Sequence, residues 1–83
     1  MKTQIITPEK RVFNGDVVVL TIPTKDGYIS IMDNHIPLVS AISPGVITIK
    51  TIKYQIVLEN EGGVLETHNN EVVVMLTKCH KKN

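Results

Sequence analysis

Two alternating runs decide the fold class of this chain, and they occupy positions 45–59 with the sequence GVITIKTIKYQIVLE. In the first run, Ile47 and Ile49 alternate with polar residues. In the second run, Ile56 and Leu58 recur at every second position. Because successive side chains of a strand point to opposite sides, this period of two predicts strands with one buried face. The β-branched composition suits such a half-buried, pleated surface.

Turn signals separate these and the other apolar runs. Asn14-Gly15 predicts a tight hairpin after the apolar pair at 12–13. The segment 38–42 fits a short helix or a short strand equally well. The remaining breaks are Lys25-Asp26-Gly27, Ser43-Pro44-Gly45, Glu61-Gly62-Gly63 and His68-Asn69-Asn70. Short runs with a turn every 8–12 residues or so indicate an all-β sandwich or barrel.

Composition limits the possible classes of protein. The chain has 83 residues, 42% of them hydrophobic and 20% charged, which is typical of one small globular domain. A net charge of +1 without a basic face argues against nucleic-acid binding. A single cysteine, Cys79, rules out an internal disulfide and fits a reduced, cytoplasmic setting. The N-terminus does not read as a signal peptide, and no run approaches the roughly 20 apolar residues that span a bilayer.

The strongest polar cluster is Asp33-Asn34-His35. A metal or hydrolytic site would need further ligands, or a nucleophile with an oriented base. We therefore interpret Asp33-Asn34 as a turn that leads His35 into the next element. Glu59 and Glu61 share a strand face, and we interpret them as ordinary charged neighbours on a solvated surface.

Three further features have structural interpretations. Cys79-His80 offers two adjacent ligands near a chain end, which is a poor metal site, so we interpret the cysteine as structural. Gly62-Gly63 lacks the spacing and the following helix of a phosphate-binding loop. It instead predicts a bulge or a close backbone approach in a sheet. The run 17–20 is apolar on both sides, and an outward valine there would be weak evidence for a protein interface.

The order of these signals resembles the N-terminal domain of ATP synthase epsilon subunits, from about Ile5 to Thr77. The most distinctive stretch covers residues 20–38 and ends in the family pattern Asn-His-x-Pro-Leu. The other blocks are Ile6-Thr7-Pro8-Glu9, Val12-Phe13-Asn14-Gly15, Ser43-Pro44-Gly45-Val46, Gly62-Gly63-Val64-Leu65-Glu66 and Asn70-Glu71-Val72-Val73-Val74-Met75. Each block by itself is weak, and the specificity lies in their order across one short chain.

The resemblance implies an all-β fold, a ten-stranded β-sandwich of two five-stranded sheets, over residues 1–78. A basic C-terminal tail at 79–83 follows, and we expect it to fray. In the family, the loops that match 26–28 and 33–35 lie at contacts with the c-ring and the gamma subunit. The predicted partner-interface residues are therefore Asp26, Gly27, Tyr28, Asp33, Asn34 and His35.

The function implied is that of a non-catalytic central-stalk (rotor) subunit without a cofactor. Such a subunit links gamma to the c-ring and couples proton transport to ATP synthesis. It would be a peripheral component at the cytoplasmic face of the bacterial inner membrane, held there by the complex, while ATP chemistry occurs on the alpha and beta subunits.

The chain departs from the family pattern in two ways. Tyr28 stands where the family often has Glu, and Ser30 where it has Gly. A tyrosine can still anchor an interface, but it loses a charge contact to the c-ring. Typical members continue into a C-terminal helical hairpin that can inhibit ATP hydrolysis and sometimes binds ATP. This chain ends where that hairpin would start, so we expect neither hairpin-based inhibition nor an ATP site.

Two other function classes stay open at this point. A free-standing domain that binds carbohydrate or single-stranded nucleic acid would need aromatic platforms, and the chain offers only Phe13, Tyr28 and Tyr54. A small hydrolase or metal enzyme would need a ligand set that the sequence lacks. Binding and activity screens separate these classes from a subunit of a larger machine.

Overall fold

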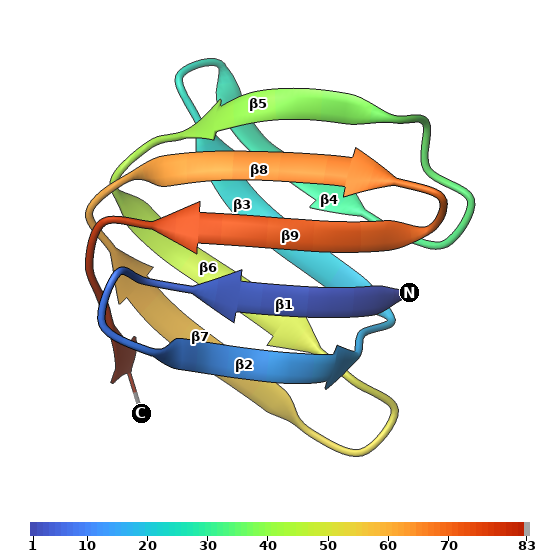
Figure 1. Ribbon diagram of the computed structural model, residues 1–83, viewed down its shortest axis with the longest axis horizontal. Helices are drawn as coiled ribbons and strands as arrows, with labels where there is room; N and C mark the ends of the chain where they lie inside the picture. The colour runs from blue at the N-terminus through green and yellow to red at the C-terminus, as the bar shows by residue number, and fades with distance from the viewer. Residues whose placement is uncertain (83) are drawn as a thin grey trace.

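Ten β-strands form two five-stranded sheets that lie face to face in the computed structural model, which describes residues 1–82 (Figure 1). The strands are β1 (Lys2–Ile6), β2 (Arg11–Asp16), β3 (Val19–Thr24), β4 (Gly27–Ile31), β5 (Leu38–Ile42), β6 (Gly45–Lys50), β7 (Gln55–Asn60), β8 (Gly63–His68), β9 (Glu71–Leu76) and β10 (Cys79–Lys82). Sheet A has the order β2-β1-β9-β8-β5 and is nearer the viewer; sheet B has the order β10-β7-β6-β3-β4. The predicted sandwich of two five-stranded sheets is confirmed.

The pair β1–β9 in sheet A is parallel, and it joins the N-terminal strand to the ninth. Ile5 lies opposite Phe13 of β2 on one side and opposite Val74 of β9 on the other. The other strand pairs within residues 1–82 are antiparallel. Because side chains alternate with a period of two, this register sends Ile5, Phe13 and Val74 together into the interior.

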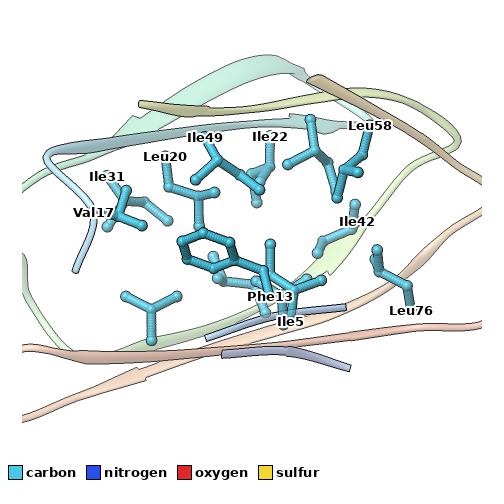
Figure 2. Close-up of a cluster of buried hydrophobic side chains, with 14 of the residues drawn as sticks. Ile5, Phe13, Val17, Leu20, Ile22, Ile31, Ile42, Ile49, Leu58 and Leu76 are labelled. Atoms are coloured by element: carbon cyan, nitrogen blue, oxygen red, sulfur yellow. The ribbon is translucent and has the colours of Figure 1, made fainter. Parts of the chain in front are cut away.

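Inward side chains of both sheets meet between the layers and form the core, as Figure 2 shows. Ile47 and Ile49 are fully buried, and Leu58 is 2% exposed, as the alternation in the two deciding runs predicts. Phe13 supplies an aromatic ring to a core made otherwise mostly of branched aliphatic residues. Burying one such side chain contributes about 1.5–3 kcal/mol, so a thin core of this kind still holds the layers together.

The predicted hairpin at Asn14-Gly15 is wrong, because both residues lie inside β2 and pair with β1. A two-residue hairpin turn of the Asn-Gly type needs positive φ at both central positions, and neither residue has it. The chain reverses earlier, where the amide of Thr7 donates a hydrogen bond to the carbonyl of Lys10 at 2.9 Å. Pairing with β1 therefore overrides the local turn preference.

The structure also settles the ambiguous segment 38–42 and the predicted break at 68–70. The segment 38–42 is the strand β5, paired with β8 at the edge of sheet A. The break at 68–70 is confirmed as the tight turn between β8 and β9. Asn69 and Asn70 have φ angles of 51° and 58° there. Asparagine tolerates this left-handed conformation better than most residues, and the hairpin twist favours it.

The expectation of a frayed tail is wrong for residues 79–82, which form β10 and pair with β7 at the edge of sheet B. Cys79 packs toward the core, while His80 contacts Glu59 on the outer face. The sandwich therefore extends beyond the predicted boundary at residue 78, and Asn83 lies outside the described residues. Across residues 1–82 there is no helix long and apolar enough to cross a membrane.

Gly63 confirms the close backbone approach predicted at Gly62-Gly63. It opens β8 directly opposite Leu76 of β9. A Cβ atom added at Gly63 would lie 2.9 Å from the Cα of Leu76 and closer still to the carbonyl oxygen of Met75. Because these neighbours are backbone atoms of a paired strand, they cannot turn aside as a side chain would.

We therefore expect Gly63→Ala to lower the free energy of unfolding by about 2–3 kcal/mol, because β8 and β9 must separate locally. Gly15→Ala is the matched control, since its added Cβ would meet only the ring of Phe13 at 3.4 Å. That control should change stability by less than about 1 kcal/mol. Urea unfolding measures both variants, and equal stabilities would contradict the close approach.

Candidate partner interface

The six predicted interface residues form two groups at opposite ends of β4 (Figure 1). Asp26, Gly27 and Tyr28 lie at the β3–β4 turn, where β4 begins. Residues 33–35 lie in the β4–β5 loop, beyond the other end of the strand. At about 3.3 Å per residue, the five steps from position 28 to 33 place the groups roughly 16 Å apart. The structure does not bring the six residues into one surface.

Thr24 holds the first group in shape. Its hydroxyl donates a hydrogen bond to the carbonyl of Gly27 at 2.6 Å and accepts one from the amide of Asp26 at 3.2 Å. Gly27 has a φ of 114°, a conformation that favours glycine. Tyr28 follows on β4 and is 60% exposed. A tight turn thus presents an exposed aromatic side chain on a fixed backbone.

The second group is held by two partners that the sequence did not reveal, Met1 and Asn70. The N-terminal ammonium of Met1 contacts Asp33 Oδ1 at 2.9 Å and donates a hydrogen bond to the carbonyl of Val17 at 3.0 Å. The side-chain amide of Asn70 donates to Asp33 Oδ1 at 3.4 Å. The side-chain oxygen Oδ1 of Asn70 accepts a hydrogen bond from the backbone amide of Asn34 at 3.2 Å. The expected turn at Asp33-Asn34 is confirmed by the φ of 65° at Asn34.

These contacts set the charge state of the loop. Hydrogen bonds from the N-terminal ammonium and from Asn70, with the positive charge of the ammonium, hold the pKa of the Asp33 carboxyl below its usual value. His35 sits differently, because both of its ring nitrogens are buried without a hydrogen-bond partner within residues 1–82. Asp33 is therefore exposed and ionised, whereas His35 packs into the loop.

Sequence reasoning missed a third surface, an apolar patch on the outer face of sheet A. The register aligns Ile6, Met75, Val64 and Ala41 in one row across four strands. The next row across the same four strands is Gln4, Val73, Glu66 and Val39, so a charged side chain stands between its two valines. The apolar patch is thus Ile6, Val39, Ala41, Val64, Val73 and Met75, of which Val39 is 72% exposed and Met75 40%. Its signal in the sequence was a second, outward pair of apolar residues in β5 and in β9.

The outer face of sheet B has a different character. Thr48, Thr21 and Ser30 form a row of hydroxyls across β6, β3 and β4. At the β7–β10 side, Glu59 contacts His80 at 3.0 Å and Lys82 at 3.4 Å. Val18, the outward valine predicted in the run 17–20, is 44% exposed beside this sheet. The outer face of sheet A therefore carries an apolar patch with Glu66 inside it, whereas hydroxyl and ion-paired side chains occupy much of the outer face of sheet B.

The polar residues considered for chemistry are dispersed. Glu59 lies in β7 with basic partners, whereas Glu61 lies in the β7–β8 connection. Cys79 points to the core and His80 away from it, so they do not share a ligand direction. Burial raises the pKa of the Cys79 thiol, as expected for a structural cysteine. Within residues 1–82, no three His, Cys, Asp or Glu side chains are grouped to hold a metal ion.

The ion pair at Asp33 predicts a specific pH dependence. A carboxyl whose pKa is lowered by folding stabilises the fold above its unfolded pKa of about 3.9, and this stabilisation disappears as pH falls through the folded pKa. Asp33→Asn should therefore be less stable than the unchanged chain at pH 6, and the difference should shrink below pH ~4. Asp26→Asn is the control, because Asp26 forms no ion pair within residues 1–82. A stability gap for Asp33→Asn that is constant across acid urea titrations would contradict the ion pair.

Comparison with known proteins gives a consistent answer. The profile of the family described as "ATP synthase, Delta/Epsilon chain, beta-sandwich domain" matches residues 1–81. A curated ATP synthase epsilon chain from Leptospira interrogans serogroup Icterohaemorrhagiae serovar copenhageni is 33% identical over 75 residues. The aligned part covers 90% of this chain and 59% of that relative, so this chain spans little more than half of the relative's length.

Solved structures show the same fold. A chain of the Euglena gracilis mitochondrial ATP synthase (OSCP/F1/c-ring) has a TM-score of 0.89 at 15% identity, covering 95% of this chain and 51% of that chain. A chain of the Tetrahymena thermophila mitochondrial ATP synthase (central stalk/c-ring) has a TM-score of 0.86 at 18% identity, covering 96% and 65%. Because the family profile spans nearly every residue and the fold agrees, this chain belongs to the family of ATP synthase delta/epsilon chain β-sandwich domains.

Proposed function

We propose that this chain is a central-stalk subunit of an F-type ATP synthase, a non-catalytic part of the rotor. In this role it links the gamma subunit to the c-ring and couples proton transport to ATP synthesis. It would sit at the cytoplasmic face of the bacterial inner membrane, attached through the complex. Family membership supports this assignment, and the related chains come from ATP synthase assemblies that include the central stalk and c-ring.

The apolar patch on sheet A is the observation that carries the proposal. Exposed apolar residues grouped on one sheet face, with charged residues at the rim, are typical of a surface that another protein covers. The rim row consists of Lys2, Glu71 and His68, which pair across β1, β9 and β8. We assign this patch to the gamma subunit, because an apolar surface suits a permanent contact within the rotor.

The two loop groups support a link between two partners. Residues 26–28 and 33–35 lie at opposite ends of β4, so two different partners can each contact one group. We assign the turn with Tyr28 to the c-ring and the loop with Asp33 and His35 to gamma. The tip of the first turn also adjoins the apolar patch, because Asp26 and Ala41 line the same surface hollow. The proposed c-ring contact at the Tyr28 turn and the proposed gamma contact at the apolar patch would therefore lie next to each other.

Stiffness supports the mechanical role. Torque passes between two contacts without loss only if the part between them does not deform, and close-packed interiors have low compressibility. Here β3 lies between β4 and β6, and its Leu20 and Ile22 are fully buried in the shared core. The loop with Asp33 is in turn tied to the N-terminus and to Asn70. Both proposed contact groups thus rest on fixed backbone.

The free-standing ligand-binding alternative receives no comparable support. Of the three aromatic residues, Phe13 is buried in the core and only Tyr28 and Tyr54 are exposed. They lie in the β3–β4 and β6–β7 regions, which are separate turns. A stacking surface for sugar rings or bases needs several aligned platforms, so this arrangement favours contact with protein.

We expect Val64→Glu to weaken binding to the gamma subunit of the same organism at least about tenfold, because it buries an unpaired charge in the interface. Val57→Glu is the matched control, since Val57 faces outward on sheet B. Co-elution on a sizing column and a binding titration measure both variants, with urea unfolding as a check of the fold. If folded Val64→Glu binds gamma as tightly as the control does, the patch is not the gamma surface.

We expect Tyr28→Ala to reduce binding to the isolated c-ring about tenfold and to leave gamma binding unchanged, because an aromatic anchor is lost at one end only. His35→Ala should do the reverse. Tyr54→Ala is the control, an exposed tyrosine in the β6–β7 turn. Separate pull-downs with gamma and with the c-ring give the comparison, and proton pumping by the reconstituted complex should fall with either variant. Identical effects of both variants on both partners would contradict the two-ended assignment.

A further inference from the structure

A second kind of site lies at the open side of the sandwich, between the edge strands β2 and β10. These strands end sheets A and B on the same side, and a cleft of about 240 Å³ lies between them. Its floor is the apolar core, exposed there at Ile56 and reaching down to Ile49 and Leu58. On the opposite side of the molecule, a hollow between the β3–β4 turn and β5 is lined by polar residues that include Asp26, Ser40 and Ser43.

Cationic side chains surround this apolar floor. Lys10 and Arg11 line the cleft from sheet A, and Lys81 lines it from sheet B. Lys81 lies on the inner side of β10, because its partner on β7 is the buried Leu58. None of these three residues belongs to an ion pair within residues 1–82, whereas His80, the fourth basic lining residue, contacts Glu59.

Among residues 1–82, no side-chain carboxylate lines the cleft. Acidic groups lie in two adjoining hollows, with Glu9 in the one that shares Lys10 and Cys79 with the cleft. Glu59 and Glu61 lie in the one that shares His80, and Glu59 is engaged by His80 and Lys82. Three unpaired cations beside buried aliphatic carbons attract a ligand that has an anionic head and an apolar tail. The volume lies below the roughly 300–1,000 Å³ of sites for drug-sized molecules, so it suits a slender chain better than a ring system.

We propose that this cleft binds a single-chain alkyl carboxylate, the chemistry of a free fatty acid. The carboxylate contacts Lys10, Arg11 and Lys81 at the mouth, and the alkyl chain lies on Ile56 and Leu58. Each methylene group that leaves water strengthens binding, and the charge contacts orient the head. This proposal is independent of the rotor assignment, because the cleft shares no residue with the apolar patch or with either loop group, although Arg11 at its mouth pairs with Ile6 of the patch.

A plainer explanation exists for part of this arrangement. An inward-pointing lysine on an edge strand, such as Lys81, discourages pairing with another chain. A bulge in β2, such as the register shift between Ile5 and Ile6, has a similar effect. Edge protection accounts for the charge on β10, but it does not require cations from both sheets around one shared apolar floor. The experiment therefore has to separate ligand binding from edge protection.

The test uses the whole 83-residue chain with decanoate, below its micelle-forming concentration, and with acetate as the head-group control. Calorimetry measures affinity, and the rate of Cys79 alkylation by N-ethylmaleimide reports occupancy, because Cys79 lines the cleft. Arg11→Gln with Lys81→Gln should weaken decanoate binding about tenfold. Lys25→Gln with Lys53→Gln removes the same charge at two distant turns and should have no effect.

The expected result is that decanoate, but not acetate, binds and slows alkylation of Cys79. Equal weakening by both double variants would overturn the proposal, since bulk charge alone would then explain binding. Binding that leaves Cys79 alkylation unchanged and is abolished by Met75→Lys would also overturn it, because the ligand would then lie on the apolar patch. An acidic peptide that protects Cys79 where decanoate does not would replace the fatty-acid site with a protein contact.

Discussion

The parallel pairing of β1 with β9 is the contact on which the rest of the structure depends. It places the N-terminal strand inside sheet A, between β2 and the C-terminal third of the chain. Without it, the β1–β2 hairpin would have no neighbour, and Ile5 and Phe13 would lose their place in the core. The same register completes the outer row that ends at Ile6, so one backbone pairing determines both the inner and the outer face of sheet A. Such a long-range contact is costly in chain entropy, and the burial of branched side chains has to offset it.

The period of two then gives the molecule its functional asymmetry. Every strand directs alternate side chains inward, and the need for a packed core determines only these inward residues. Sheet B uses its outward set for hydroxyls and an ion-paired glutamate, which suit water. Sheet A uses part of its outward set for aliphatic residues, which suit a protein surface. The charged row at the far end of sheet A limits that surface to part of the face. A rigid part with an apolar patch on one outer face and exposed loops at both ends of β4 suits a link between two larger subunits.

The sequence predicted the fold class, most strand positions and the close approach at Gly63, because alternation and glycine placement are local signals. Prediction from the sequence was wrong where pairing with a strand distant in the sequence determined the local structure. Asn14-Gly15 has the local chemistry of a hairpin turn, but β1 pairs with both residues. The sequence of residues 79–82 is typical of a solvated basic tail, but these residues pair with the edge of β7. Of the six predicted interface residues, Asp26, Asp33 and Asn34 lie in turns as expected, whereas Gly27 and Tyr28 open β4. The separation of the two groups along β4, and the contacts of Asp33 and Asn34 with Met1 and Asn70, depend on tertiary structure. The apolar patch also required the register, since no single strand contains it.

The measurement that most directly tests the central claim is oxidative footprinting of the gamma complex. Met75 is 40% exposed at the centre of the apolar patch, and Tyr54 is 54% exposed in a turn of sheet B. Their rates of hydroxyl-radical modification are compared in the free chain and in the complex with gamma. If gamma covers the outer face of sheet A, modification of Met75 falls severalfold while that of Tyr54 is unchanged. If Met75 reacts equally fast in a complex that has demonstrably formed, gamma binds elsewhere and the account of the apolar face is wrong.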